Sequence, residues 1–336
     1  MCALFGWLDC GKVLPIRLLK KLTQTLANAA EERGTDASGI SYIKDDNQVT
    51  IYKRPKPAHK IKFRIPHDTG AVMGHTRFAT QGDAEINYNN HPFYGHADVD
   101  FAFAHNGVIH NYHSLHTSEQ LPEPKIETDS YVAVQLLEKS GKLDMDSLKS
   151  MAEKIRGSFV FTALDQNQTL YFVKGSNPLC LLYFEQFGLY VYASTESIMK
   201  TALKRVGLHK ETCIKIKVVE GEIISIDRNG VLNRDRFNLY DDFFYFQKSN
   251  TYYDYEKYDI TAYTEYEQLV INYCSHFGID KSDVMILLDY GYTANEIEEF
   301  LTDTDLFYEA LRIALGEDDD SDPDQMGFDL CDICRW

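Results

Sequence analysis

The chain has 336 residues, and its hydrophobic fraction of 44% is typical of a globular protein with a substantial core. Its formal net charge of −17 argues against partners such as nucleic acid or an anionic membrane, because both are bound through an excess of Lys and Arg. No apolar run approaches the roughly 20 residues of a membrane span, and Asp9 interrupts the first apolar stretch, which is not typical of a signal peptide. We therefore expect a cytoplasmic protein whose seven cysteines are thiols.

Hydrophobic spacing predicts a layered fold in the first two thirds of the chain. The apolar segment 2–10 predicts a strand, and the spacing of Leu and Ala over 16–32 predicts an amphipathic helix. Further strands are expected at 38–43, 49–52, 71–77, 100–105, 157–164, 170–173, 189–193, 213–219 and 222–226, and helices at about 128–139, 145–155 and 195–205. Many strands with helices gathered into a few blocks indicate sheets covered by helices.

The character of the sequence changes near residue 235. The segment 240–266 is crowded with Tyr, Phe and Asp and contains no Gly or Pro, so it is not a flexible linker; packing against the main domain is one interpretation. Helical spacing follows, and Thr293 with Glu296 has the pattern of a capping box. We expect a main domain at 1–235, a helical appendage of unknown role at 236–316 and an acidic, mostly disordered tail at 317–336.

Cys2 is the first candidate for chemistry. Removal of Met1 would leave one residue that carries both a thiol and a free α-amine. The thiol is a strong nucleophile, and the amine, which titrates at about 7.7–8.0, can accept a proton near neutral pH. A Met-Cys start is common by chance, however. The alternative to a catalytic role is that Cys2 is simply a buried cysteine of the strand.

Two later segments combine glycines with charged side chains. Residues 33–39 have the sequence RGTDASG, in which the glycines would also suit a plain helix-to-strand turn. Residues 74–82 have the sequence GHTRFATQG. Arg77 closes a predicted strand there and is well placed to bind a carboxylate through two parallel hydrogen bonds.

Two further segments supply hydrogen-bond donors and a carboxylate. In 105–107, HNG, the Asn106 side-chain amide and the Gly107 N–H are two adjacent donors, the minimum for an oxyanion hole, although an Asn-Gly turn is the alternative. In 127–130, ETDS, Asp129 begins a predicted helix, where the alternative role is an N-cap.

Taken in this order behind Cys2, these segments resemble the class II glutamine amidotransferase domain. This N-terminal-nucleophile hydrolase domain occurs in glutamine–fructose-6-phosphate transaminase, amidophosphoribosyltransferase and asparagine synthetase. Softer matches, among them HPF at 91–93 and SNPL at 176–179, extend the resemblance over about residues 2–230. It implies an α+β fold, the αββα sandwich, in which two antiparallel sheets face each other and helices cover both outer faces.

The resemblance also implies the catalytic roles. After removal of Met1, Cys2 would attack the side-chain amide of glutamine and form a γ-glutamyl thioester, with its own α-amine as the base. Asn106 and Gly107 would hold the tetrahedral oxyanion. The products would be glutamate and ammonia.

Substrate binding follows from the same resemblance. Arg77, assisted by Thr80, would bind the α-carboxylate of L-glutamine, Asp129 would bind the α-ammonium, and His105 belongs to the same substrate-binding set. One cation and one anion at a fixed separation would reject simple amides.

The sequence departs from the family pattern at two positions. Gln81 stands where the family often has His, and Phe78 stands where it often has Trp or Tyr. Gln can still donate a hydrogen bond and Phe can still stack, so we expect retained activity with altered affinity for glutamine.

Partners and metals are less constrained by the sequence. No GxxxxGK[ST] phosphate loop follows residue 235, so ammonia is expected to be released or passed to a separate synthase. Cys331 and Cys334 provide half of a zinc site, and we expect no metal there, with an intermolecular zinc as the alternative. No cofactor is implied, and a homo-oligomer stays open.

Two other functions remain as alternatives. The first is an N-terminal-cysteine amidase that acts on a different amide. The second is a non-catalytic protein that binds glutamine or serves as a scaffold.

Overall fold

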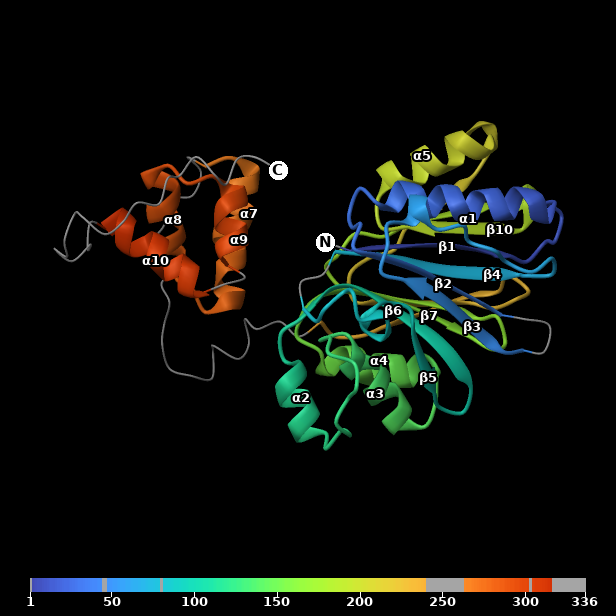
Figure 1. The fold of residues 1–336 in the computed structure, drawn as a ribbon, viewed down its shortest axis with the longest axis horizontal. Helices are drawn as coiled ribbons and strands as arrows, with labels where there is room; N and C mark the ends of the chain where they lie inside the picture. The colour runs from blue at the N-terminus through green and yellow to red at the C-terminus, as the bar shows by residue number, and fades with distance from the viewer. Residues whose placement is uncertain (1, 44–46, 79–80, 240–262, 302–303, 316–336) are drawn as a thin grey trace. The chain divides into compact units, whose positions relative to one another are not determined.

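The computed structural model describes residues 2–43, 47–78, 81–239, 263–301 and 304–315 (Figure 1). Contacts divide the chain into two compact units, Met1–Tyr240 and Asp241–Trp336. The functional domain limits stay predictions, and the acidic tail at 317–336 lies outside the described residues. In the described part of the chain, no helix combines the length and apolar character that crossing a membrane would need.

Two antiparallel sheets form the centre of the first unit. The seven-stranded sheet has the order β11-β9-β10-β1-β4-β2-β3, and the six-stranded sheet has the order β13-β12-β8-β7-β6-β5. The strands of the first sheet are β1 (Ala3–Asp9), β2 (Ala37–Ile43), β3 (Val49–Arg54), β4 (Ala71–Arg77), β9 (Cys180–Phe184), β10 (Leu189–Ala193) and β11 (Ile214–Ile216). Those of the second are β5 (Phe93–His96), β6 (Asp100–Ile109), β7 (Gly157–Asp165), β8 (Leu170–Lys174), β12 (Glu222–Ile226) and β13 (Leu232–Arg236).

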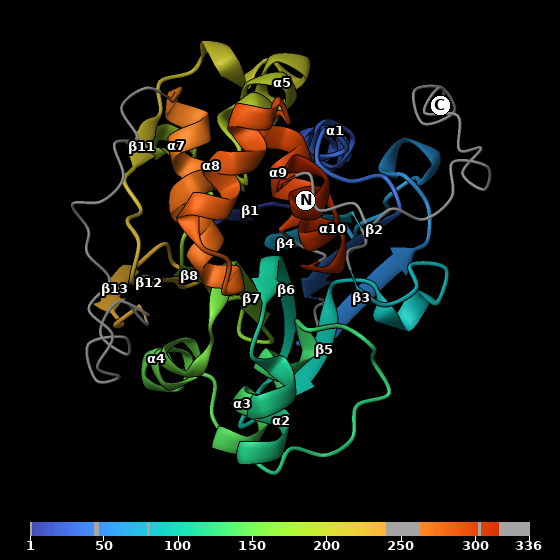
Figure 2. The same ribbon diagram turned by 90° about the vertical axis from the view of Figure 1, so that its left-hand side faces the viewer.

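Helices cover the outer faces of both sheets. In Figures 1 and 2, one side of the sandwich carries α1 (Ile16–Ala30) and α5 (Glu196–Val206), and the opposite side carries α3 (Tyr131–Ser140) and α4 (Met145–Lys154). The short helix α2 (Tyr112–Ser118) lies on the same side as α3. The fold is therefore the predicted αββα sandwich.

Strand β1 is buried on both faces, which explains the apolar run near the start of the sequence. Successive strand side chains point to opposite faces. Phe5 and Trp7 belong to the cluster under α1 and α5, whereas Leu4 and Leu8 belong to the cluster between the sheets. A strand of this kind loses the alternation of polar and apolar residues that marks a half-buried strand.

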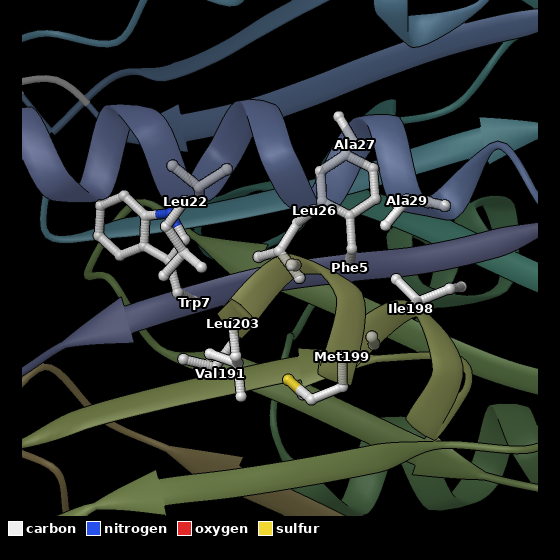
Figure 3. Packing of buried hydrophobic residues seen from close by; sticks show 14 of the residues in the cluster. Phe5, Trp7, Leu22, Leu26, Ala27, Ala29, Val191, Ile198, Met199 and Leu203 are labelled. Atoms are coloured by element: carbon white, nitrogen blue, oxygen red, sulfur yellow. The ribbon is translucent and has the colours of Figure 1, made fainter. Parts of the chain in front are cut away.

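Helix α1 packs on the seven-stranded sheet through an apolar face (Figure 3). Leu22 and Leu26 are four residues apart, so they lie on one face of the helix, and both are fully buried with Phe5. The Trp7 Nε1 donates a hydrogen bond to the Thr23 Oγ1 at 2.9 Å, which satisfies the indole group inside this layer.

Some elements differ from the sequence-based expectations. Three short strands, β5, β9 and β13, and the helix α2 are not predicted by the hydrophobic spacing. β13 ends at Arg236 and pairs with β12, so residue 236 belongs to the six-stranded sheet and not to a helical segment. β11 is shorter than the expected strand 213–219.

The described part of the second unit is helical. It contains α7 (Glu265–Tyr273), α8 (Lys281–Tyr290), α9 (Ala294–Phe300) and α10 (Thr304–Leu315), which share a separate apolar core. The predicted capping box precedes α9: the Glu296 N donates to the Thr293 Oγ1 at 3.3 Å, and the Thr293 N donates to the Glu296 Oε2 at 2.8 Å. The segment 240–262, which holds most of the aromatic run, lies outside the described residues.

Replacing Leu26 with Ala should destabilise the first unit by about 2–5 kcal/mol, because it opens a cavity between α1 and β1. The measurement is urea unfolding of the full chain, followed by the fluorescence of the buried Trp7 in a Trp336→Phe background. The matched control is Val13→Ala, whose side chain is 63% exposed and should change the free energy of unfolding by less than about 0.5 kcal/mol. Equal effects of the two substitutions would contradict this packing.

Candidate active site

Cys2 stands directly before β1, and two of the motifs meet there. Its Sγ lies 3.5 Å from the carbonyl O of Phe78, and the Arg33 Nε donates to the Cys2 carbonyl O at 2.8 Å. The Cys2 side chain is partly buried. Burial raises the pKa of the thiol, whereas the positive charge of Arg77 lowers that pKa. Because the thiolate is the reactive form, attack by Cys2 needs a nearby base.

The RGTDASG segment connects α1 to β2, which agrees with the helix-to-strand turn given above as the alternative for this segment. It also packs closely against the end of β4. A Cβ at Gly34 would lie 2.4 Å from the carbonyl C of Arg77, so the backbones approach too closely for any other residue. The Asp36 N donates to the Arg77 O at 3.0 Å. These contacts hold Arg77 and the Cys2 end of β1 together.

The guanidinium of Arg77 is buried and bridges a side chain and a loop. Its Nη1 donates to the Asn90 Oδ1 at 2.7 Å, and its Nη2 donates to the carbonyl O of Gly82 at 2.8 Å and to that of Gln81. Arginine stays protonated in proteins, so Arg77 places a fixed positive charge at the end of β4. Thr80, expected to assist Arg77, lies outside the described residues.

Lys53 adds a second cation that the sequence analysis did not identify. Its Nζ donates to the carbonyl O of Pro92 at 3.0 Å and to that of Asn90. Asn90 therefore joins the two cations, because its side chain accepts from Arg77. Burial, followed by the charge of Arg77, lowers the pKa of Lys53 to about 8. A lysine at the end of a short strand carries no sequence signal of this arrangement.

Asn106 and Gly107 lie inside β6, opposite Val160 and Phe159 of β7, so the alternative of an Asn-Gly turn is wrong. The Asn106 side chain is buried, and its Nδ2 has no hydrogen-bond partner among the described residues. Gly107 has φ 144°, and a Cβ there would lie 1.9 Å from the Ser158 O. The strand thus holds a buried, unpaired amide donor beside a backbone conformation that requires glycine.

The carboxylate of Asp129 faces the same strand. Its Oδ2 accepts a hydrogen bond from the Ile109 N at 2.6 Å, and its Oδ1 accepts one from the Ser130 Oγ at 3.2 Å. The N-cap residue of α3 is Ser130, so the alternative role of Asp129 as the helix cap is wrong. Asp129 is instead a buried carboxylate bound to neutral groups.

Histidines tie the two sheets together beside these residues. Leu4 of β1 pairs with His75 of β4, and the His75 Nε2 lies 2.9 Å from the carbonyl O of His105 in β6. The His105 Nδ1 lies 2.8 Å from the Ser130 Oγ, next to Asp129. The charge of Asp129 raises the pKa of the Cys2 thiol, opposing the effect of Arg77. These contacts link the strand that follows Cys2, through β4 and β6, to the residue next to Asp129.

Comparisons with known proteins show which family this domain belongs to. The family model described as a glutamine amidotransferase domain matches residues 75–201. The isomerizing glutamine–fructose-6-phosphate aminotransferase of Staphylococcus aureus strain Mu50 is 30% identical over 250 residues, which cover 70% of this chain and 39% of that enzyme. The chain contains a class II glutamine amidotransferase domain. The enzyme of the same name from Staphylococcus epidermidis is 29% identical over 66% of the chain and 38% of its own length, so this chain spans about two fifths of these relatives.

Solved structures share the fold of the amidotransferase domain. The glutamine phosphoribosylpyrophosphate amidotransferase from B. subtilis aligns with a TM-score of 0.55 and 21% identity, over 71% of this chain and 50% of that chain. A structure described as the allosteric regulatory enzyme of purine biosynthesis aligns with a TM-score of 0.57 and 21% identity, over 71% of this chain and 49% of that chain. At this identity, the likeness concerns the fold alone.

The two departures from the family pattern flank the Cys2 end of the amidotransferase domain. The Gln81 Nε2 donates a hydrogen bond to the Tyr112 Oη, and the Phe78 side chain is 51% exposed.

Within the described residues, no group of three or more His, Cys, Asp or Glu side chains could hold a metal ion. Cys331 and Cys334 lie outside those residues, and their metal-free state stays a prediction.

Three buried histidines of the amidotransferase domain are neutral at physiological pH. Burial lowers the pKa of His75 to about 3, that of His91 well below 6.5, and that of His105 as well. The His91 ring packs 4.3 Å from that of His75 and 4.2 Å from that of Phe93, centroid to centroid. Its two ring nitrogens have no hydrogen-bond partner among the described residues.

These histidines should make the domain sensitive to mild acid. Histidines in the unfolded chain take up protons near pH 6.5, whereas the buried His75 and His91 do so only at much lower pH. Stability is therefore lost as the pH falls below 6.5. Between pH 7 and pH 5 each of these two histidines should remove about 2 kcal/mol from the free energy of unfolding.

The check is urea unfolding at both pH values for the wild type and for His91→Leu, in which the loss should be smaller by about 2 kcal/mol. His67→Gln is the control, because His67 is exposed and its replacement should leave the pH dependence unchanged. The same pH dependence in His91→Leu and the wild type would refute this account.

Proposed function

We propose that the domain hydrolyses the side-chain amide of L-glutamine to glutamate and ammonia through a thioester on Cys2. The observation that carries the proposal is the Asn106 Nδ2, a buried amide donor without a partner among the described residues. An unmade hydrogen bond of this kind costs about 1–3 kcal/mol. An oxyanion that forms next to Asn106 during the reaction would accept this hydrogen bond.

The reaction begins once Met1 is removed and the α-amine of Cys2 is free. The amine accepts the thiol proton, and the Sγ attacks the amide carbon to form the C–S bond. The carbonyl oxygen becomes an oxyanion, which the Asn106 Nδ2 and the Gly107 N–H stabilise. The C–N bond then breaks, ammonia leaves with the proton held by the amine, and water hydrolyses the thioester to glutamate.

Two opposite charges select the substrate. Arg77 binds the α-carboxylate, and its three hydrogen bonds to Asn90 and to the loop after β4 keep the guanidinium at a fixed position. Asp129 binds the α-ammonium, and its contacts with Ile109 and Ser130 orient the carboxylate. A carboxylate oriented by neutral donors is suited to a charge-assisted hydrogen bond with a cationic ligand. His105 supports this end of the site through Ser130.

The ammonia has two possible fates in this proposal. It is released, or it is passed to a synthase partner. The alternatives of another amide substrate and of a non-catalytic glutamine-binding or scaffold protein are separated from glutamine hydrolysis by the two experiments below.

The first experiment measures glutamate release from the full chain, with the intact mass recorded to establish that Met1 is absent. Cys2→Ala should abolish release, because the nucleophile is lost. Asn106→Ala should lower kcat by about 10²–10³, the cost of one oxyanion donor. The control is Asn229→Ala in the exposed turn after β12. Equal release from the wild type and Cys2→Ala, or glutamine binding without turnover, would defeat the proposal.

The second experiment tests the charge clamp. Asp129→Asn should raise the KM for L-glutamine by about 10–100-fold, because a charge-assisted hydrogen bond is worth about 1.5–3 kcal/mol. The wild type should discriminate against glutaramate, which lacks the α-ammonium, and Asp129→Asn should discriminate less. Asp146→Asn, on the exposed start of α4, is the matched control. Glutaramate turnover equal to that of glutamine in the wild type would favour an amidase for other amides.

A further inference from the structure

The loop between β8 and β9 reaches the proposed oxyanion hole through one side chain. The Asn177 Nδ2 donates a hydrogen bond to the carbonyl O of Asn106 at 2.8 Å. Asn177 is separated from Asn106 by 71 positions in the sequence, so this contact joins the loop that crosses from the six-stranded sheet to the seven-stranded sheet to the interior of β6. The Asn177 side chain is half-buried.

The accepting carbonyl belongs to the peptide group that carries the Gly107 N–H. A peptide group is planar and trans, so its C=O and its N–H point in opposite directions. Fixing the carbonyl of Asn106 on one side therefore fixes the direction of the Gly107 N–H on the other. A hydrogen bond to the carbonyl also polarises the group and makes its N–H a stronger donor.

The backbone at Gly107 needs such support. Its φ of 144° departs from regular strand geometry, and a Cβ there would lie 2.6 Å from the Asn177 Nδ2. Strained conformations of this kind persist where the surroundings over-determine them. Asn177 contacts the strand at this point, next to the residue whose side-chain amide is the other proposed oxyanion donor.

From this geometry we infer that Asn177 is a positioning residue of the oxyanion hole, which aims the Gly107 N–H at the substrate by holding the Asn106 carbonyl. The inference rests on the proposed function for its effect on catalysis, but the orientation of the peptide group can be observed without turnover. A residue that only anchored the loop would change neither the Gly107 amide nor the reaction rate.

The test replaces Asn177 with Leu, which has a similar size but no donor, and with Gln, which keeps the amide. Asn177→Leu should lower kcat for glutamine about tenfold with little change in KM, less than the loss of a direct oxyanion donor. Asn177→Gln should recover part of that loss. Asn233→Leu, on the exposed face of β13, is the control and should leave both constants unchanged.

A second readout does not depend on activity. The sequence contains two Asn-Gly pairs, 106–107 and 229–230. Full-length protein labelled with carbonyl ¹³C in Asn and ¹⁵N in Gly therefore gives two amide signals in a carbonyl-edited NMR spectrum. Asn177→Leu should move the Gly107 signal and leave the Gly230 signal in place.

The results of these experiments test the proposed glutamine hydrolysis and the positioning role of Asn177 separately. An inactive, Met-processed wild type would refute the proposed function, and the Gly107 signal would then decide the inference alone. An unmoved Gly107 signal, or an unchanged kcat in an active Asn177→Leu, would overturn the positioning role. Loss of kcat together with a moved Gly107 signal would support it.

Discussion

One contact between the sheets holds the candidate site together: the His75 Nε2 of β4 donates to the carbonyl of His105 in β6. Side-chain packing fills most of the interface between the sheets and is largely non-directional. A hydrogen bond instead fixes two backbones at one distance and angle. Because β4 pairs with β1, and Asn106 follows His105, this contact sets the position of the proposed oxyanion donors relative to Cys2.

Positive and negative side chains lie on different elements around this contact. Arg77 and Lys53 place two cations near the end of β4, linked by Asn90, while Asp129 places an anion beside β6. The histidines between them are neutral because burial lowers their pKa values. Of the charges around Cys2, Arg77 lowers the pKa of the thiol and Asp129 raises it. A zwitterionic substrate matches that pattern.

Most residues of the proposed site were predicted because the motifs combine charged, amide and glycine residues that a fold rarely requires together for stability. The sandwich was predicted from the family resemblance, and the hydrophobic spacing of the strands and helices is consistent with it. Lys53 and Asn90 were not predicted, because their importance arises from contacts across the fold that their sequence neighbours do not indicate. Asn177 lies in the SNPL segment that matches the family softly, but the sequence does not show its contact with Asn106. For the HNG segment, the alternative interpretation was a turn, because Asn-Gly pairs favour turns locally. In the structure the segment lies in β6, where pairing with β7 overrides that local preference. The roles of the site residues stay predictions.

The buried groups without partners suggest how stability and function are related in this domain. The Asn106 Nδ2 and both ring nitrogens of His91 lack partners among the described residues, and each unsatisfied group destabilises the fold by about 1–3 kcal/mol. Three apolar clusters in the sandwich offset such costs. For Asn106 the cost also has a use. A donor that is unsatisfied before the reaction gains its hydrogen bond as the oxyanion forms, and only a bond that strengthens in the transition state accelerates the chemical step.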